Sequence, residues 1–88
     1  MRVLLVEDHV ELADTLAEVL RREGMAVDVV HDGADAVAHT EVTAYDVIVL
    51  DRDLPVLHGD EVCRRLAAAR YPGRILMLTA AGTVEDRV

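Results

Sequence analysis

Two kinds of apolar pattern alternate along this sequence. Short continuous apolar runs predict β-strands, whereas longer stretches with apolar residues three or four positions apart predict helices. The predicted strands are residues 2–6, 27–30, 47–50 and 75–79. Three helices are predicted. The first begins at Asp8, the second covers residues 34–41, and the third begins at Asp60. This alternation of strand and helix predicts a parallel sheet with right-handed crossovers and helices on both faces.

Small and polar residues mark the ends of the predicted helices. Asp8, with Glu11 three positions later, has the spacing of a capping box, in which side chains satisfy the first free N–H groups of a helix. Gly24 suits the position just after the end of that helix. The third helix is expected to bury three side chains: Val62, Leu66 and Ala69. Residues 83–86 have the composition to begin one more helix.

The most informative stretch is the third predicted strand. Its four branched apolar residues, 47–50, are typical of a strand that is buried on both faces of a parallel sheet. The run ends directly in a carboxylate, Asp51. The first strand repeats this arrangement, because residues 3–6 are followed by Glu7 and Asp8. Any proposed function has to explain why two buried strands both end in acidic residues.

The ends of these two strands predict a binding site. In open α/β sheets, ligands bind beyond the carboxyl ends of the strands, where the strand order reverses. If the first and third strands are neighbours, about 4.8 Å apart, then Glu7, Asp8 and Asp51 converge on one crevice. Clustered carboxylates raise one another's pKa unless a cation neutralises them, and Mg²⁺ is suited to such oxygen ligands. A carboxylate beside Mg²⁺ can attack phosphorus and form an acyl phosphate.

Ordinary structural explanations remain open for several of these residues. Asp8 would serve equally well as the N-cap of the first helix, and Glu7 as a solvated residue at a strand end. Thr79 is a common strand former. Asp51 is harder to explain in this way, because a solvated acid rarely interrupts so continuous an apolar run. The four histidines lack the spacing of metal ligands and are interpreted as surface residues.

Composition limits the partners of the chain. Seventeen acidic and nine basic residues give a net charge of −8, which would repel nucleic-acid phosphates and anionic membranes. The apolar run after Arg2 is too short for a signal peptide or a membrane span. The lone Cys63 cannot form an internal disulfide, which suits a reducing cytoplasm. We therefore expect one cytoplasmic domain with no membrane partner.

Four motifs in register along the whole chain resemble those of the receiver domain of bacterial two-component response regulators. They are Glu7-Asp8, Asp51, Leu54-Pro55 with Gly59 four residues later, and Thr79-Ala80. The resemblance implies a flavodoxin-like, doubly wound parallel sheet with strand order 2-1-3-4. The sequence of residues 51–55 is most similar to that of regulators that carry a C-terminal winged-helix DNA-binding domain.

The resemblance also implies the ligands of a metal ion. Asp51 would be the phosphoacceptor and would bind Mg²⁺ together with Asp8. The backbone carbonyl of Asp53 would complete the protein ligands, and Glu7 would assist through a water molecule.

The same resemblance implies contacts with the phosphoryl group and a set of partners. Thr79 would donate a hydrogen bond to the phosphoryl group after transfer, and Ala80 would leave room for its approach. The phosphodonor would be a sensor histidine kinase. Regulation of transcription would act on DNA only through a C-terminal effector domain that is absent from this chain.

The chain departs from the family pattern at its end. It stops at Val88, before the family's fifth strand and last helix, and it contains no lysine to pair with the phosphoryl group. We therefore expect residues 1–88 to be a C-terminally truncated receiver. Without a fifth strand, residues 75–79 would form a bare apolar edge, which favours pairing with a second copy of the chain.

An enzyme is the main alternative. Phosphatases of the haloacid-dehalogenase type also place a nucleophile after an apolar strand, in an Asp-x-Asp motif that Asp51 and Asp53 match. However, Pro55 occupies a position where that family has Thr or Val, and such enzymes need a longer chain. A nucleotide-binding module is a third interpretation, but the first strand is not followed by a Gly-rich phosphate loop.

Overall fold

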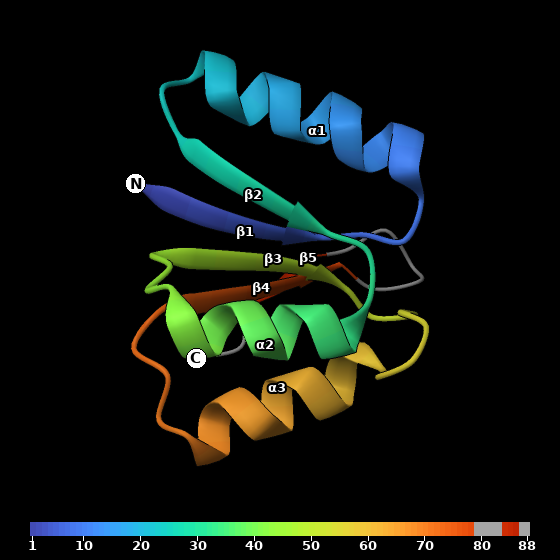
Figure 1. Cartoon of the computed structure of the whole chain (residues 1–88), viewed down its shortest axis with the longest axis vertical. Coiled ribbons are helices and arrows are strands. Elements are labelled where there is room, and N and C mark those ends of the chain that lie inside the picture. The colour runs from blue at the N-terminus through green and yellow to red at the C-terminus, as the bar shows by residue number, and fades with distance from the viewer. Residues whose placement is uncertain (79–83, 87–88) are drawn as a thin grey trace.

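Over the residues that the structure describes, 1–78 and 84–86, the chain forms one five-stranded sheet with helices on both faces (Figure 1). The coordinates are a computed structural model. The strands are β1 (Arg2–Val6), β2 (Ala26–Val30), β3 (Val47–Asp51), β4 (Arg74–Leu78) and β5 (Val84–Asp86). The helices are α1 (Val10–Arg22), α2 (Gly33–Val42) and α3 (Gly59–Ala68).

The sheet has the topology that the alternating pattern predicts. Its strands lie in the order β2-β1-β3-β4-β5, and β1 to β4 are parallel. The helix α1 lies on one face, and α2 and α3 lie on the other (Figure 1). The order 2-1-3-4 is therefore confirmed. Because β1 lies between β2 and β3, the strand order reverses at β1, which is where α/β sheets bind ligands.

The segment after β4 differs from expectation. The predicted fourth helix at residues 83–86 is wrong, because Val84–Asp86 is a strand that pairs antiparallel with β4. Leu76 lies opposite Asp86, and Leu78 lies opposite Val84. The expectation of a bare edge along β4 is wrong for the same reason, since β5 occupies that edge over three residue pairs.

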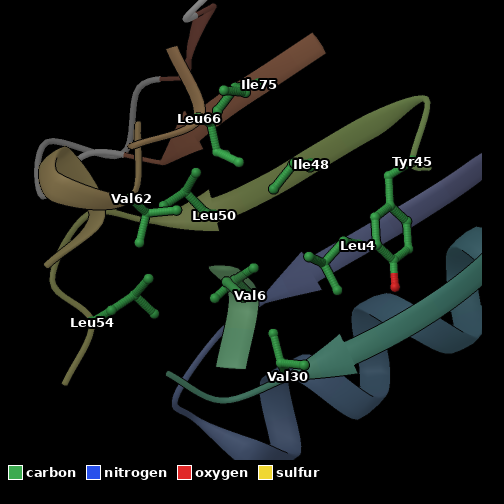
Figure 2. Packing of buried hydrophobic residues seen from close by; sticks show 11 residues of the cluster. Leu4, Val6, Val30, Tyr45, Ile48, Leu50, Leu54, Val62, Leu66 and Ile75 are labelled. Carbon is green, nitrogen blue, oxygen red and sulfur yellow. The ribbon is translucent and has the colours of Figure 1, made fainter. Parts of the chain in front are cut away.

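Side chains that alternate along the strands build two separate cores. The larger core lies under α2 and α3 and contains 11 buried residues, among them Leu4, Val6, Ile48 and Leu50 (Figure 2). The smaller core lies under α1 and includes Val3, Leu5, Ala13, Ala17 and Val27. Successive strand residues face opposite sides of the sheet. All four apolar residues of β1 after Arg2 are therefore buried, two on each face.

The two faces of β3 are buried to different degrees. Ile48 and Leu50 are fully buried beneath α2 and α3, but Val47 and Val49 are only partly buried. The expectation that β3 is buried on both faces is therefore right for one face only. The physical reason is that α1 packs its buried alanines over β1 and β2 and reaches β3 only at its border.

Helix ends correct two further expectations. The helix α1 begins after His9, whose Nδ1 accepts a hydrogen bond from the Leu12 N–H at 3.2 Å, so Asp8 is not its N-cap. Gly24 follows the C-cap with φ +89°, as its proposed position requires. In α3, Val62 and Leu66 are buried, but Ala69, the C-cap residue, is exposed like the two residues before it. The rest of the predicted inner face is confirmed.

A polar network ties three strands together at their amino ends. Tyr45 is 3 % exposed, and its hydroxyl donates to the Asp28 carboxylate at 2.7 Å. The Arg2 guanidinium binds the same carboxylate oxygen at 3.0 Å and lies 5.9 Å from the centre of the Tyr45 ring. The hydrogen bonds from Tyr45 and then Arg2 lower the pKa of Asp28. Figure 2 shows Tyr45 at one end of the larger core, with Leu54 and Val62 at the other.

Replacing Tyr45 tests how much this network contributes to stability. The change Tyr45→Phe keeps the buried ring but removes the hydroxyl that Asp28 accepts from. We expect the free energy of unfolding to fall by about 1 kcal/mol, since Asp28 remains partly exposed to water. Urea unfolding measures the loss. Arg22→Gln, which breaks an exposed ion pair within α1, is the control and should cost less than about 0.5 kcal/mol. Equal losses in the two variants would contradict this role of Tyr45.

Candidate metal centre

Three carboxylates meet at the carboxyl edge of the sheet. Val6 lies opposite Leu50 in the pairing of β1 with β3, so Glu7 and Asp51 end neighbouring strands at the same level. Oxygen atoms of Glu7, Asp8 and Asp51 all lie within 4.8 Å of one another. The structure therefore brings together the three acids that the sequence places at two strand ends.

The three acids differ in their exposure. Glu7 is 6 % exposed, Asp51 is partly buried and Asp8 is exposed. The backbone N–H of Glu7 donates to the Val30 carbonyl at 3.1 Å, and its carboxylate accepts from the His9 N–H at 3.3 Å. The site thus opens to solvent at Asp8 and closes at Glu7.

Burial and the neighbouring acids change the protonation of Glu7. Burial, followed by the Asp8 side chain, raises the pKa of Glu7 to about 7, and the charge on Asp51 adds to the effect. The hydrogen bond from the His9 N–H acts in the opposite direction. Without a cation, Glu7 therefore keeps its proton to a higher pH than an ordinary glutamate does. Protonation of Glu7 reduces the electrostatic repulsion among the three acids.

The donors of the site fit Mg²⁺. All three side chains offer carboxylate oxygens, which are hard ligands, and Mg²⁺ usually binds one or two carboxylates and keeps several waters. The cluster can be completed by water because Asp8 is exposed. The raised pKa of Glu7 is a second sign of fit, since it shows unrelieved negative charge that a divalent cation would neutralise.

The backbone after β3 orients Asp51. The Asp53 N–H donates to Asp51 Oδ1 at 3.2 Å, which leaves the other carboxylate oxygen free of this contact. The Arg52 N–H donates to the Leu78 carbonyl at 3.0 Å and extends the pairing with β4 by one bond. Leu54 is buried in the larger core and anchors the loop. Asp53 itself is exposed, so its side chain is not aimed at the cluster's interior.

Three of the four histidines lie at the carboxyl edge of the sheet, although the sequence predicts no more than a surface position for them. His31 Nδ1 lies 2.8 Å from the carbonyl oxygen of Glu7, His9 caps α1, and His58 caps α3. All three are exposed, as expected, but His39 in α2 is partly buried, which corrects that expectation for one residue. Their positions in the sequence could have indicated this placement, because each of the three directly follows a strand or precedes a helix at the carboxyl edge of the sheet.

Two of the predicted site residues lie outside the described part of the chain. The described residues of β4 end at Leu78, which lies opposite Asp51 in the pairing with β3. Thr79 and Ala80, the predicted phosphoryl contacts, follow it in the sequence and are not described. Their roles therefore remain predictions. Within the described residues, no helix is both long and apolar enough to cross a membrane.

Comparison with known proteins identifies the family. The family model of the response regulator receiver domain matches residues 3–88. The chain belongs to this family. A receiver is a regulatory phosphoacceptor domain rather than a catalytic enzyme, so the phosphatase interpretation has no support.

Two curated relatives of this receiver are named as transcriptional regulators. The transcriptional regulatory protein CutR of Streptomyces coelicolor is 61% identical over 88 residues, which are 100% of this chain and 41% of that protein. The transcriptional regulatory protein TcrA of Mycobacterium tuberculosis is 47% identical over 88 residues, again 100% of this chain and 35% of that protein. The receiver thus spans less than half the length of the curated relatives it matches.

Solved receiver structures have the same fold. The receiver domain of the Francisella response regulator 1452 has a TM-score of 0.88 and 26% identity, covering 93% of this chain and 68% of that chain. The response regulator TrrA of Thermotoga maritima, in complex with Mg²⁺ and BeF, has a TM-score of 0.84 and 30% identity. That match covers 90% of this chain and 69% of that chain.

The raised pKa of Glu7 predicts how stability depends on pH without metal. The folded state holds this proton up to about pH 7, whereas an unfolded glutamate loses it near its ordinary pKa of 4.5. Between these values the folded state binds more protons, so the free energy of unfolding should decrease as pH rises through this range and then level off. Urea unfolding in a chelating buffer, from about pH 5 to about pH 8, measures the decrease.

The change Glu7→Gln provides the control for this pH dependence. Glutamine keeps the size of the side chain but cannot ionise, so this part of the decrease should disappear. Addition of Mg²⁺ to the wild type should also reduce it, because the cation stabilises the ionised acids. The same pH slope in wild type and Glu7→Gln would contradict the assignment of the raised pKa to Glu7.

Proposed function

We propose that this receiver is a phosphorylation-dependent switch in which Asp51 accepts a phosphoryl group from the phosphohistidine of a sensor histidine kinase. The observation that carries the proposal is the setting of the Asp51 carboxylate. Its Oδ1 accepts from the Asp53 N–H at 3.2 Å, and the group lies within the acidic cluster of Glu7 and Asp8. One carboxylate oxygen is thereby oriented, and the other is available for attack.

A metal site accompanies this role. Asp8, Asp51 and the backbone carbonyl of Asp53 would hold Mg²⁺, and Glu7 would assist through a water molecule. Bound Mg²⁺ supplies positive charge that offsets the negative charge of the transferred phosphoryl group. Glu7 is the most buried of the three acids, and its raised pKa would allow its carboxyl group to donate to or accept from a bound water.

The transfer itself needs positioning more than covalent help from the protein. A carboxylate oxygen of Asp51 forms a bond to phosphorus while the bond from phosphorus to the histidine nitrogen breaks, and that electron pair returns to the imidazole. The product is a mixed anhydride whose phosphoryl group carries up to two negative charges, at most one more than the ionised carboxylate carried before transfer. Thr79 would donate a hydrogen bond to the phosphoryl group, and Ala80 would leave space for it.

The partners follow from the family and from the charge of the chain. The net charge of −8 disfavours direct contact with DNA, so we propose that residues 1–88 are the receiver part of a longer transcriptional regulator whose further domain binds DNA. The relatives named as transcriptional regulators support this assignment. We place the protein in the cytoplasm, where a sensor kinase would meet it. A second copy of the receiver is a further candidate partner.

Phosphorylation of Asp51 is tested with a small phosphodonor. With acetyl phosphate and Mg²⁺, Asp51→Asn should abolish hydroxylamine-sensitive labelling of the purified protein, because an amide is not a nucleophile toward phosphorus. Asp53→Asn is the matched control: it removes an exposed carboxylate two residues away but keeps the backbone groups, so most labelling should remain. Labelling retained in Asp51→Asn would show that another residue is the acceptor.

Metal binding is tested by titration. We expect Asp8→Asn to weaken Mg²⁺ binding by more than about tenfold, because it removes the charge of a direct ligand. Glu7→Gln should weaken it less, since Glu7 acts through water. Isothermal titration calorimetry at neutral pH compares the two variants with the wild type. An unchanged affinity in Asp8→Asn would remove the proposed metal site.

A further inference from the structure

The first residue of α2 lies against the loop that follows Asp51. The Gly33 N–H donates to the Pro55 carbonyl at 3.4 Å. A Cβ at this position would lie 2.0 Å from the carbonyl oxygen of Leu57, and 2.8 Å from both the carbonyl carbon and the Cβ of that residue. Ordinary contact begins near 3.4 Å, so any side chain here would force helix and loop apart by more than an ångström. Much of that movement would have to be borne by backbone.

Conformation does not explain this glycine. Gly24 has φ +89°, which favours glycine, whereas Gly33 has no such positive angle. Alanine would form the first turn of α2 more readily than glycine does. What Gly33 provides is the absence of a side chain where the loop passes. The close approach of α2 to the loop is therefore the physical reason for glycine at this position.

The loop at this contact is strained. Val56 has φ +68°, a region that β-branched residues rarely adopt, and its side chain is 81 % exposed. The Leu57 N–H donates to the Pro55 carbonyl at 2.7 Å, which closes a γ-turn around Val56. Such strain persists only where the surroundings hold it. The Pro55 carbonyl also accepts from Gly33 on one side of the turn, and the partly buried Leu57 packs against the larger core on the other, so both sides are anchored.

We propose that Gly33 is a positioning residue for the acidic site. Its contact holds residues 55–57 in the γ-turn, and this turn begins two residues after Asp53. Asp53 in turn orients the Asp51 carboxylate through its N–H and, in the proposed function, offers its carbonyl to Mg²⁺. A helix that contributes no ligand therefore sets the position of two groups at the site. The inference rests on the proposed Mg²⁺ site.

The change Gly33→Ala tests the contact. In the purified protein we expect the dissociation constant for Mg²⁺ to rise about ten- to hundredfold, the range for loss of a group that orients metal ligands. Without metal, the NMR signal of the Asp53 amide should already shift, because the added methyl group moves the loop. Gly24→Ala is the matched control: it strains the backbone at φ +89°, but a Cβ there has no atom within 4 Å. It should lower the melting temperature and change Mg²⁺ affinity by less than about twofold.

A second pair of variants tests the same turn from its exposed side. Val56→Pro cannot adopt φ +68°, because proline holds φ near −65°, and it should weaken Mg²⁺ binding as Gly33→Ala does. Val56→Gly adopts the positive angle without strain and should retain the wild-type affinity. Wild-type affinity in both Gly33→Ala and Val56→Pro would overturn the inference and leave the metal site intact. A wild type that does not bind Mg²⁺ would overturn the proposed function, and the inference with it.

Discussion

Parallel pairing of β1 with β3 in register is the constraint on which the site depends. Because Val6 lies opposite Leu50, the acids that follow these strands leave the sheet at one level and face each other. Burial of Glu7 and its repulsion by the other acids together cost roughly 3 kcal/mol, from a Glu7 pKa of about 7. Each fully buried apolar side chain contributes about 1.5–3 kcal/mol. Four such residues in β1 outweigh the repulsion, so packing of the strands holds the acids together.

Because packing holds the three acids close together, the repulsion among them would make the site sensitive to any added charge. In the proposed function, a cation at the cluster would displace the proton from Glu7, and a phosphoryl group on Asp51 would add charge in the same place. Both events act on a group of atoms that packing does not allow to separate. The free energy of either event would then act on the loops around the cluster. The loop after β3 is the nearest of these, because its Asp53 N–H binds the Asp51 carboxylate.

The two faces of the sheet differ in how well they are packed and in how much they support the acidic site. The face under α2 and α3 carries the larger core, and the loop after Asp51 is anchored on that side by Leu54. The α1 face is less complete, with Val47 and Val49 only partly buried. The best-packed part of the molecule thus supports the segment whose position matters most for chemistry. Gly33 lies on the same side and contacts the same loop, which is the basis for the positioning role that we propose for it.

Local patterns determined the elements, their order and the acids at the strand ends, because strand and helix periodicity and strand-end position are written in neighbouring residues. They did not determine β5, since pairing of Val84–Asp86 with β4 depends on a neighbour in space and overrode a local preference for helix. The same limit applies to the N-cap of α1: its position in the sequence suited Asp8 to this role, but in the tertiary structure His9 is the cap and Asp8 belongs to the acidic cluster. Gly33 is the clearest case, because its sequence neighbours mark a turn and only the packing of α2 on the loop shows what its missing side chain is for.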